Sequence, residues 1–129
     1  MLNIYVLFIR SVLEQSCVVW HSSLTEEENL ALERVQKATL RIILDLEYTD
    51  YLSALSLTNL ETLRSRRKYL CLRFAQKCVK KGKFDDLFPL NSKNVNTRPH
   101  EKFYVTRAKT DRLAKSSVPY LQRLLNEKL

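Results

Sequence analysis

The sequence predicts a mostly α-helical protein, and three features support this fold class. Apolar residues make up 45% of the 129 residues, enough to bury the core of one domain. One glycine and three prolines leave little material for tight hairpin turns between strands. Apolar side chains also recur at the three- and four-residue spacings of amphipathic helices. We expect an antiparallel helical hairpin, a short helix, a long basic helix, and an irregular C-terminal tail that ends in a short helix.

The hairpin is predicted from the first third of the chain. Residues 3–20 are apolar apart from one narrow polar stripe, so we expect this helix to be buried on most sides. The second helix begins at Thr25, whose spacing to Glu28 is that of a capping box. A connection of about four residues between them predicts an antiparallel arrangement. The apolar face of the second helix is predicted to comprise Ala31, Leu32, Val35, Ala38, Ile42, Ile43 and Leu46.

The short helix and the long basic helix follow. Residues 48–57 fit two to three helical turns. Thr58 and Glu61 repeat the capping-box spacing and start a helix that runs to about Lys81, where Gly82 suits the position after the last turn. The apolar stripe of this helix is predicted to comprise Leu60, Leu63, Leu70, Cys71, Phe74, Ala75 and Cys78.

The tail after Gly82 has less regular patterning. We expect a turn that places Phe84, Leu87 and Phe88 on the core, a loop over residues 90–100, and an extended segment at 103–107. A final helix starts at Ser117 or Val118, with Pro119 near its first position. On this basis residues 1–83 form a helical bundle, and residues 84–129 form a basic extension that packs on it.

Two side chains are expected to have structural roles. Arg67 falls inside the apolar stripe of the long helix. Because an unpaired buried charge is costly, its guanidinium is expected to pair with a carboxylate rather than a phosphate, the candidates being Asp45, Glu47 and Asp50. Trp20 lies near a helix end and is interpreted as covering the core rather than binding a ligand.

Charge is distributed unevenly along the chain. Residues 1–47 carry 4 Lys/Arg against 7 Asp/Glu, whereas residues 48–129 carry 18 against 7. A split of this kind points to a polyanionic partner for the second part. Phe103 and Tyr104 are placed to stack on unpaired bases. The alternative is a solvated basic face that keeps the protein soluble. The candidate nucleic-acid contacts are Arg64, Arg66, Lys68, Arg73, Lys77, Lys80, Arg107, Lys109 and Arg112.

No catalytic residue, metal or cofactor is expected for this chain. Asp85 and Asp86 have the composition of the paired carboxylates that hold two metal ions in polymerases, but the segment before them ends a helix and offers no strand partner. A solvated acidic turn is therefore favoured. Cys17 and His21 are four residues apart and both could reach one metal, yet Cys71, Cys78 and His100 have no metal-finger spacing.

The cysteines and the apolar runs bear on compartment. Three irregularly spaced cysteines do not form a disulfide framework, so an intracellular location, cytoplasmic or nuclear, is expected. The apolar run at residues 4–9 is too short for a membrane span and lacks the flanks of a signal peptide. Neither a membrane nor a small-molecule substrate is expected as a partner.

Seven short segments carry a family resemblance by their order. They are FIRSVLE at 8–14, VWH at 19–21, LERVQK at 32–37, RII at 41–43, Leu60-Glu61 with Arg66-Arg67, KSSVP at 115–119 and LLN at 124–126. In this order they resemble the region downstream of the polymerase core in reverse transcriptases of non-LTR (jockey-like, LINE-type) retrotransposons. The resemblance covers nearly the whole chain.

The resemblance implies a helical region after the palm, namely the thumb and the segment beyond it, where the family grips the template–primer duplex. The core pattern of the first two helices and the Arg66-Arg67 pair are the features that transfer. The fingers, the palm and their catalytic aspartates are absent from this sequence, so RNA-directed DNA polymerase activity is not expected of it. We expect a non-catalytic fragment that binds RNA–DNA or DNA duplex through phosphates, without sequence specificity.

A helical protein–protein interaction module is the rival hypothesis. If a reverse transcriptase palm normally covers the first helix, the uncovered face would pair with itself or with a partner, without any nucleic-acid role. Ile4, Phe8, Val12 and Val19 would form that face.

Overall fold

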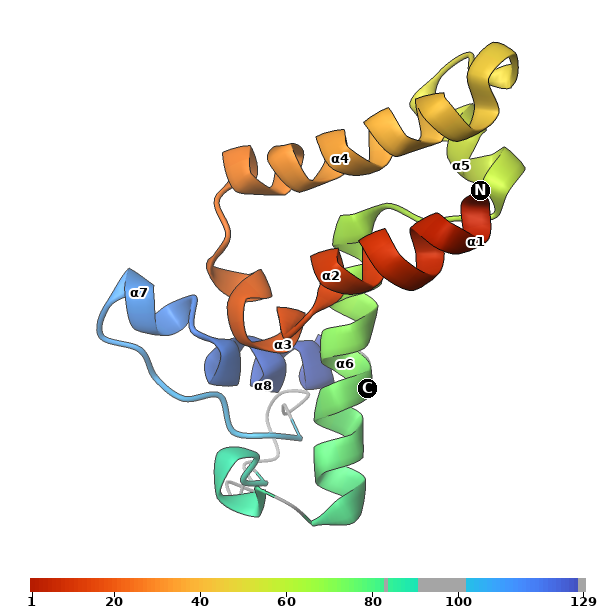
Figure 1. The fold of residues 1–129 in the computed structure, drawn as a ribbon. Helices are drawn as coiled ribbons and strands as arrows, with labels where there is room; N and C mark the ends of the chain where they lie inside the picture. The colour runs from red at the N-terminus through yellow and green to blue at the C-terminus, as the bar shows by residue number, and fades with distance from the viewer. Residues whose placement is uncertain (83, 91–101, 128–129) are drawn as a thin grey trace. The chain divides into compact units, whose positions relative to one another are not determined.

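The mostly α-helical fold class is confirmed. The structure, a computed structural model, describes residues 1–82, 84–90 and 102–127, and within these ranges it contains helices and a single isolated bridge, Leu90 to Phe103, but no regular strand (Figure 1). Two compact units are present. Unit 1 comprises Met1–Cys17 and Leu24–Lys68, and unit 2 comprises Val18–Ser23 and Tyr69–Leu129. The units do not coincide with the predicted boundary after residue 83, because the long helix contributes residues to both.

The predicted single helix over residues 3–20 is interrupted. Four short segments take its place: α1 (Leu2–Ile4), the π-helical segment η1 (Tyr5–Ile9), α2 (Arg10–Glu14) and α3 (Cys17–Trp20). The 3₁₀ turn η2 (His21–Ser23) follows them. The break falls at Ser16, whose φ of +53° is left-handed and cannot continue a right-handed helix. Since neither glycine nor proline marks this position, local sequence gave no indication of it.

The expectation that the first helical segment is buried on most sides is wrong. Tyr5 is its buried side chain, at 1% exposure, whereas Ile4, Phe8 and Val12 are 58%, 67% and 68% exposed. Apolar composition shows that a face would gain free energy from burial, but it does not show that the same chain covers it.

Helix α4 (Glu26–Leu44) begins as predicted. The Glu28 N–H donates to Thr25 Oγ1 at 3.3 Å and the Thr25 N–H donates to Glu28 Oε2 at 2.7 Å, which completes the capping box. Its predicted apolar face is largely wrong, because the buried residues are Asn29, Gln36 and Leu40. Leu32 and Ile43 are half-buried, and the exposed members of the predicted face are Ala31, Val35, Ala38, Ile42 and Leu46.

Gln36 lies on the buried face of α4, where both polar atoms of its side chain are hydrogen-bonded. Its Oε1 accepts from the Tyr5 hydroxyl at 2.5 Å, and its Nε2 donates to Tyr51 Oη and to the Glu61 carbonyl, both at 3.0 Å. A buried amide with these partners avoids the penalty of an unsatisfied polar group. One side chain thus joins η1, α4, α5 and the segment before α6.

Glu33 extends this network by one turn of α4. The Tyr51 hydroxyl donates to Glu33 Oε2 at 2.5 Å, and Glu33 Oε1 accepts from the Arg64 N–H at 2.9 Å. That N–H lies in the first turn of α6, where backbone donors have no partner within the helix. Glu33 therefore ties α5 and the start of α6 to α4.

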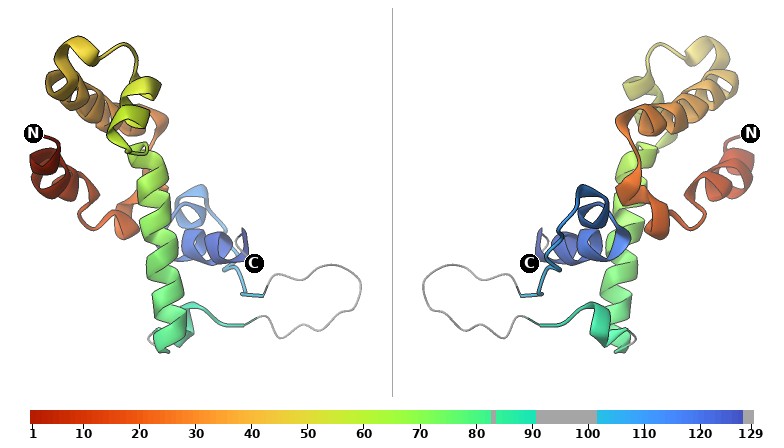
Figure 2. Two further views of the ribbon diagram at one scale, coloured as in Figure 1. Left: turned by 90° about the vertical axis from the view of Figure 1, so that its right-hand side faces the viewer. Right: turned by 90° about the vertical axis from the view of Figure 1, so that its left-hand side faces the viewer.

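Helix α5 (Tyr51–Thr58) folds back beside the C-terminal end of α4 (Figures 1 and 2). Asp50 caps it, and Asn59 ends it in the left-handed region with φ +53°. Helix α6 (Leu63–Lys81) starts later than predicted. Thr58 is the last residue of α5, and the cap belongs to Thr62, whose Oγ1 accepts from the Ser65 N–H at 3.2 Å.

Unit 2 has its own core between the second part of α6 and α8 (Ser117–Glu127), the predicted final helix. The short elements η4 (Asp85–Leu87) and α7 (Asp111–Ala114) lie between them in the chain. The turn after Gly82 was predicted to place three apolar side chains on the core. Phe88 is buried as predicted, but Phe84 and Leu87 are 59% and 41% exposed. The core comprises Cys71, Ala75, Cys78, Phe88, Phe103, Leu121, Leu124 and Leu125.

Two amide side chains of α8 hold the extended segment. Asn126 accepts from the Phe103 N–H and donates to the Phe103 carbonyl, both at 3.0 Å. Gln122 accepts from the Thr106 N–H and donates to the Leu87 carbonyl, both at 2.7 Å. The backbone of the predicted extended segment is thus bonded to a helix rather than to a strand. Residues 91–100 of the predicted loop lie outside the described residues.

Replacing Gln36 by Leu should destabilise unit 1 by about 2–4 kcal/mol, because the change leaves buried groups at Tyr5 and Glu61 without their partner. Urea unfolding followed by circular dichroism measures the effect. The same change at the exposed Gln76 should shift stability by no more than about 0.5 kcal/mol. Equal stability of the two variants would show that the network contributes nothing.

Unit 1 should lose stability in alkali. Burial raises the pKa of Tyr5 to about 12, and burial together with the hydrogen bond to Glu33 raises the pKa of Tyr51. The pKa of tyrosine in the unfolded chain is near 10. The contribution of the two buried, neutral tyrosines to the free energy of unfolding is therefore complete below about pH 10, and it is lost as pH rises toward their pKa values in the folded protein. Between pH 8 and pH 11 the wild-type urea midpoint should fall more than that of the Tyr5→Phe/Tyr51→Phe variant. Parallel pH curves would contradict this origin.

Candidate nucleic-acid interface

Helix α6 is the main cationic element of the structure. Its sequence from Leu63 to Lys81 contains eight Lys and Arg residues and no Asp or Glu. Residues 63–68 belong to unit 1 and residues 69–81 to unit 2, so the predicted contacts are divided between the units. The two groups have different surroundings.

The arginines in the first part of α6 already have carboxylate partners. Arg64 Nη2 lies 2.8 Å from Glu26 Oε1, in a solvated pair. Arg66 Nε lies 3.3 Å from Glu14 Oε1, and its Nη1 lies 3.9 Å from Glu61 Oε1. A phosphate would have to compete with these carboxylates, so Arg64 and Arg66 are weaker candidates than the sequence suggested.

Arg67 is buried, with 0% exposure, in keeping with a structural role. Its Nη2 donates to Asn29 Oδ1 at 2.7 Å, and the Asn29 Nδ2 in turn donates to the Thr25 carbonyl at 3.0 Å. Asp50, one of the three carboxylates predicted to pair with Arg67, is instead the N-cap residue of α5. The sequence did not lead us to Asn29 as the partner of Arg67. Its helical spacing to the buried residues Gln36 and Leu40 of α4 was the signal that could have found it.

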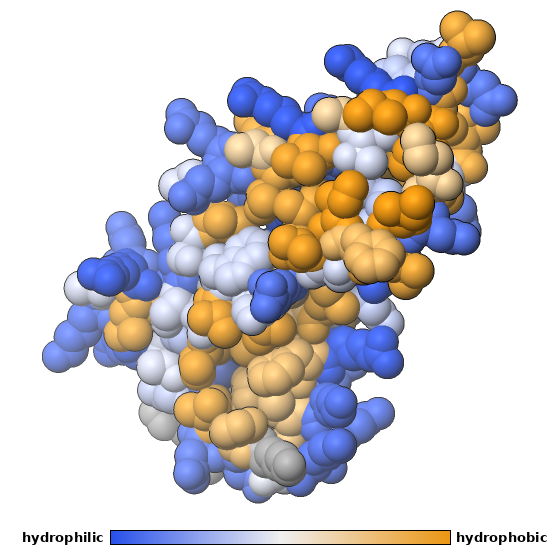
Figure 3. Space-filling view, in the orientation of Figure 1, coloured by the Kyte–Doolittle hydropathy of each residue, from blue (hydrophilic) through white to orange (hydrophobic). Residues whose placement is uncertain are grey.

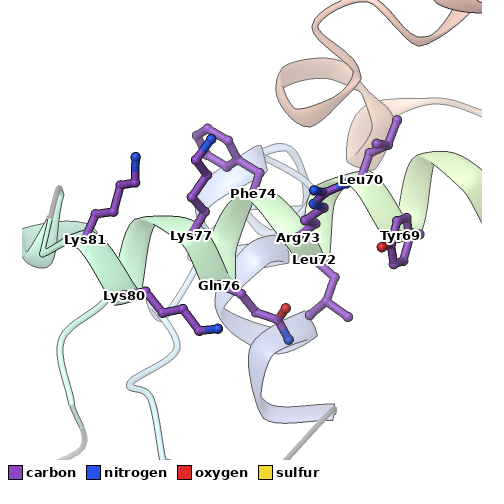
Figure 4. A pocket seen from close by; sticks show the side chains of 9 residues that line it. All are labelled: Tyr69, Leu70, Leu72, Arg73, Phe74, Gln76, Lys77, Lys80 and Lys81. Atoms are coloured by element: carbon purple, nitrogen blue, oxygen red, sulfur yellow. The ribbon is translucent and has the colours of Figure 1, made fainter.

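The cationic side chains in the second part of α6 have different surroundings. Arg73, Lys77, Lys80 and Lys81 are exposed and share one broad face of the helix (Figure 4). Within residues 1–82, 84–90 and 102–127, no carboxylate oxygen lies within 4.0 Å of these four side chains. An open hollow of about 630 Å³ follows this face. All of its lining residues come from α6, so it is an accessible surface rather than an enclosed pocket.

The predicted contacts in the tail also lie in unit 2. Arg107, Lys109 and Arg112 are exposed, in the segment before α7 and in α7 itself. Lys68, by contrast, is exposed at the end of the unit 1 portion of α6. The prediction that Phe103 stacks on bases is wrong, because its ring is 4% exposed and belongs to the core, whereas Tyr104 is 48% exposed.

The uneven charge of the sequence also divides the two units. Unit 1 contains 8 Lys/Arg and 9 Asp/Glu, a net charge of −1. Unit 2 contains 14 Lys/Arg and 5 Asp/Glu, a net charge of +9. Unit 2 is therefore the part of the molecule suited to a polyanion.

The other candidate chemistries acquire no site. Asp85 and Asp86 are exposed in η4, and Cys17 and His21 are buried and belong to different units. His21 instead packs edge-on against Tyr120, with ring centroids 5.6 Å apart, while Trp20 is half-buried. Across the described ranges, no three His, Cys, Asp or Glu side chains are grouped to hold a metal ion. His100 lies outside these ranges.

No single helix of the described chain is long and apolar enough to cross a membrane. The consecutive segments Leu2–Glu14 and Cys17–Ser23 have the length and apolar composition of a membrane span only when they are taken together.

Comparisons with protein-family models, with curated proteins and with solved structures found no significant match to this chain.

Proposed function

We propose that the chain binds nucleic acid non-specifically through phosphates, and that unit 2 carries the binding surface. The observation that supports this most directly is the set of four exposed cations on α6 without a carboxylate partner in the described chain. The +9 charge of unit 2 supplies the long-range attraction. A basic face that served solubility alone would not require every acid to be absent from a 19-residue helix.

The expected binding mode follows from the chemistry of this face. Lysines and an arginine on an open helix surface meet phosphates and release condensed counterions, so affinity falls steeply with salt. Such contacts position a protein on a duplex without reading its sequence. The chain would then act as a non-catalytic clamp on the backbone.

We further propose that this clamp is the thumb and post-palm region of a non-LTR retrotransposon reverse transcriptase. The support is the ordered set of segments from residues 8 to 126 and the mostly helical fold. In this proposal the clamp holds the template–primer duplex, and the polymerase chemistry belongs to a palm domain that this sequence does not contain.

The Arg73→Gln/Lys77→Gln variant tests the binding face. If both side chains neutralise phosphates, the slope of log affinity against log salt should become shallower by about 2 on duplex DNA. A matched variant, Arg34→Gln/Arg41→Gln, removes two cations from α4 in unit 1 and should leave the slope nearly unchanged. A filter-binding salt series on duplex DNA and RNA–DNA hybrid gives both values. Equal losses in the two variants would mean that only net charge matters.

A second candidate function, a helical interaction module, is favoured by the surface of unit 1. Ile4, Phe8 and Val12 are more than half exposed, and apolar side chains gather on the face that carries α1 to α2 (Figure 3). Val19, the fourth residue of the predicted face, is 69% exposed and belongs to unit 2. Large exposed apolar areas of this kind typically mark interaction sites.

The exposed residues of helix α4 indicate that the partner of unit 1 is a second copy of this chain. Ala31, Val35, Ala38 and Ile42 are exposed at spacings of four, three and four residues, the seam of a helix pair. In an antiparallel pair, Ile42 of one copy faces Ala31 of the other, and Val35 faces Ala38, so that large residues meet small ones. The acidic first turn of α4 would also approach the end of the partner helix that carries Arg41.

Substituting Ile42 by Glu should abolish this self-association, because it places a charge in the apolar seam. Sedimentation across the micromolar range should show a concentration-dependent dimer for the wild type and a monomer for the variant. Leu52→Glu is the matched control, since Leu52 is exposed on α5 outside the seam. A wild-type chain that stays monomeric would eliminate this candidate.

A further inference from the structure

A small hollow lies where the end of α6 meets the turn that follows it. Its volume is about 270 Å³, and its lining residues are Phe74, Lys77, Cys78, Lys81 and Phe84. Phe74, Lys77 and Lys81 recur at spacings of three and four residues, and their side chains leave the same side of the helix (Figure 4). Two phenylalanines and two lysines therefore line one hollow.

The two rings are not core residues. Phe74 is 42% exposed and Phe84 is 59% exposed, although the sequence pattern placed both on the core. Phe84 also has φ +67° and ψ +35°, a left-handed conformation that is uncommon for a bulky aromatic residue. Backbone strain at an exposed aromatic side chain is not explained by burial, and strained residues of this kind cluster at binding sites.

The cations beside the rings are available to a ligand. Lys77 and Lys81 are exposed, and no carboxylate in the described chain lies within 4.0 Å of either ammonium group. A ligand that uses both features presents a flat aromatic face and a nearby negative charge. An acidic peptide would satisfy the lysines but would leave the two ring faces unused.

We infer that this hollow binds one unpaired nucleotide, with its base against Phe74 and Phe84 and its phosphate at Lys77 and Lys81. Aromatic side chains beside a positive groove are the usual means of holding single-stranded nucleic acid. A base within a duplex is stacked on both faces and cannot enter. The inference rests on the proposed nucleic-acid binding and adds that unit 2 distinguishes an unpaired end or gap from a continuous duplex.

The test uses a short DNA single strand that contains one 2-aminopurine and the same strand in a duplex. Stacking should quench the fluorescence when the full chain binds the single strand. Phe74→Leu and Phe84→Leu keep apolar volume but remove the ring, and each should weaken single-strand binding about 10-fold and abolish the quenching. Both should leave duplex affinity unchanged. Phe8→Leu removes an exposed aromatic ring from unit 1, outside the hollow, and serves as the matched control, and circular dichroism verifies helicity for every variant.

The outcomes separate the two proposals. Quenching that depends on both Phe74 and Phe84 and not on Phe8 supports the nucleotide site. Salt-sensitive binding to both strands, unaffected by the phenylalanine substitutions, would overturn the site and leave the phosphate clamp intact. Absence of binding to either form would overturn both.

Discussion

The carboxamide of Gln36 is the group on which the arrangement of unit 1 depends. It is fully buried and bonds to Tyr5, Tyr51 and the Glu61 carbonyl, which come from three separate segments of the chain. A polar group of this kind is stable inside only when its partners are all in place, so it fixes the register of α4 against its neighbours. Because Gln36 lies on the face of α4 that points into unit 1, much of the apolar surface of the helix faces solvent.

The division of charge in α6 has a similar origin. The helix itself supplies cations along its whole length, and the acids come from other parts of unit 1, namely Glu14, Glu26 and Glu61. Where those acids are within reach, the arginines are neutralised and stabilise the fold. In the portion that belongs to unit 2, the described chain brings no acid to Arg73 or Lys77, and their charge remains available to a partner.

Features set by a few neighbouring residues could be predicted from the sequence, and features set by distant partners could not. The Thr25 capping box and the final helix depend on local spacing, and both are present. The buried face of α4 depends on Tyr5 and Tyr51, and the pairing of Arg66 depends on Glu14, all far away in the chain. Composition therefore indicated a cationic surface, but it did not separate the arginines that stabilise the fold from the cations that face solvent.

The bonds between Asn126 and Phe103 show a side chain acting as a peptide group. The carboxamide presents one acceptor and one donor to the backbone of Phe103, as a neighbouring strand would. Aspartate has the same shape but no donor at neutral pH, so deamidation at this position would set a carboxylate oxygen against the Phe103 carbonyl. The extended segment would then lose its attachment to α8 through a change of one atom, which makes Asn126 a point at which chemical ageing of the chain would loosen the core of unit 2.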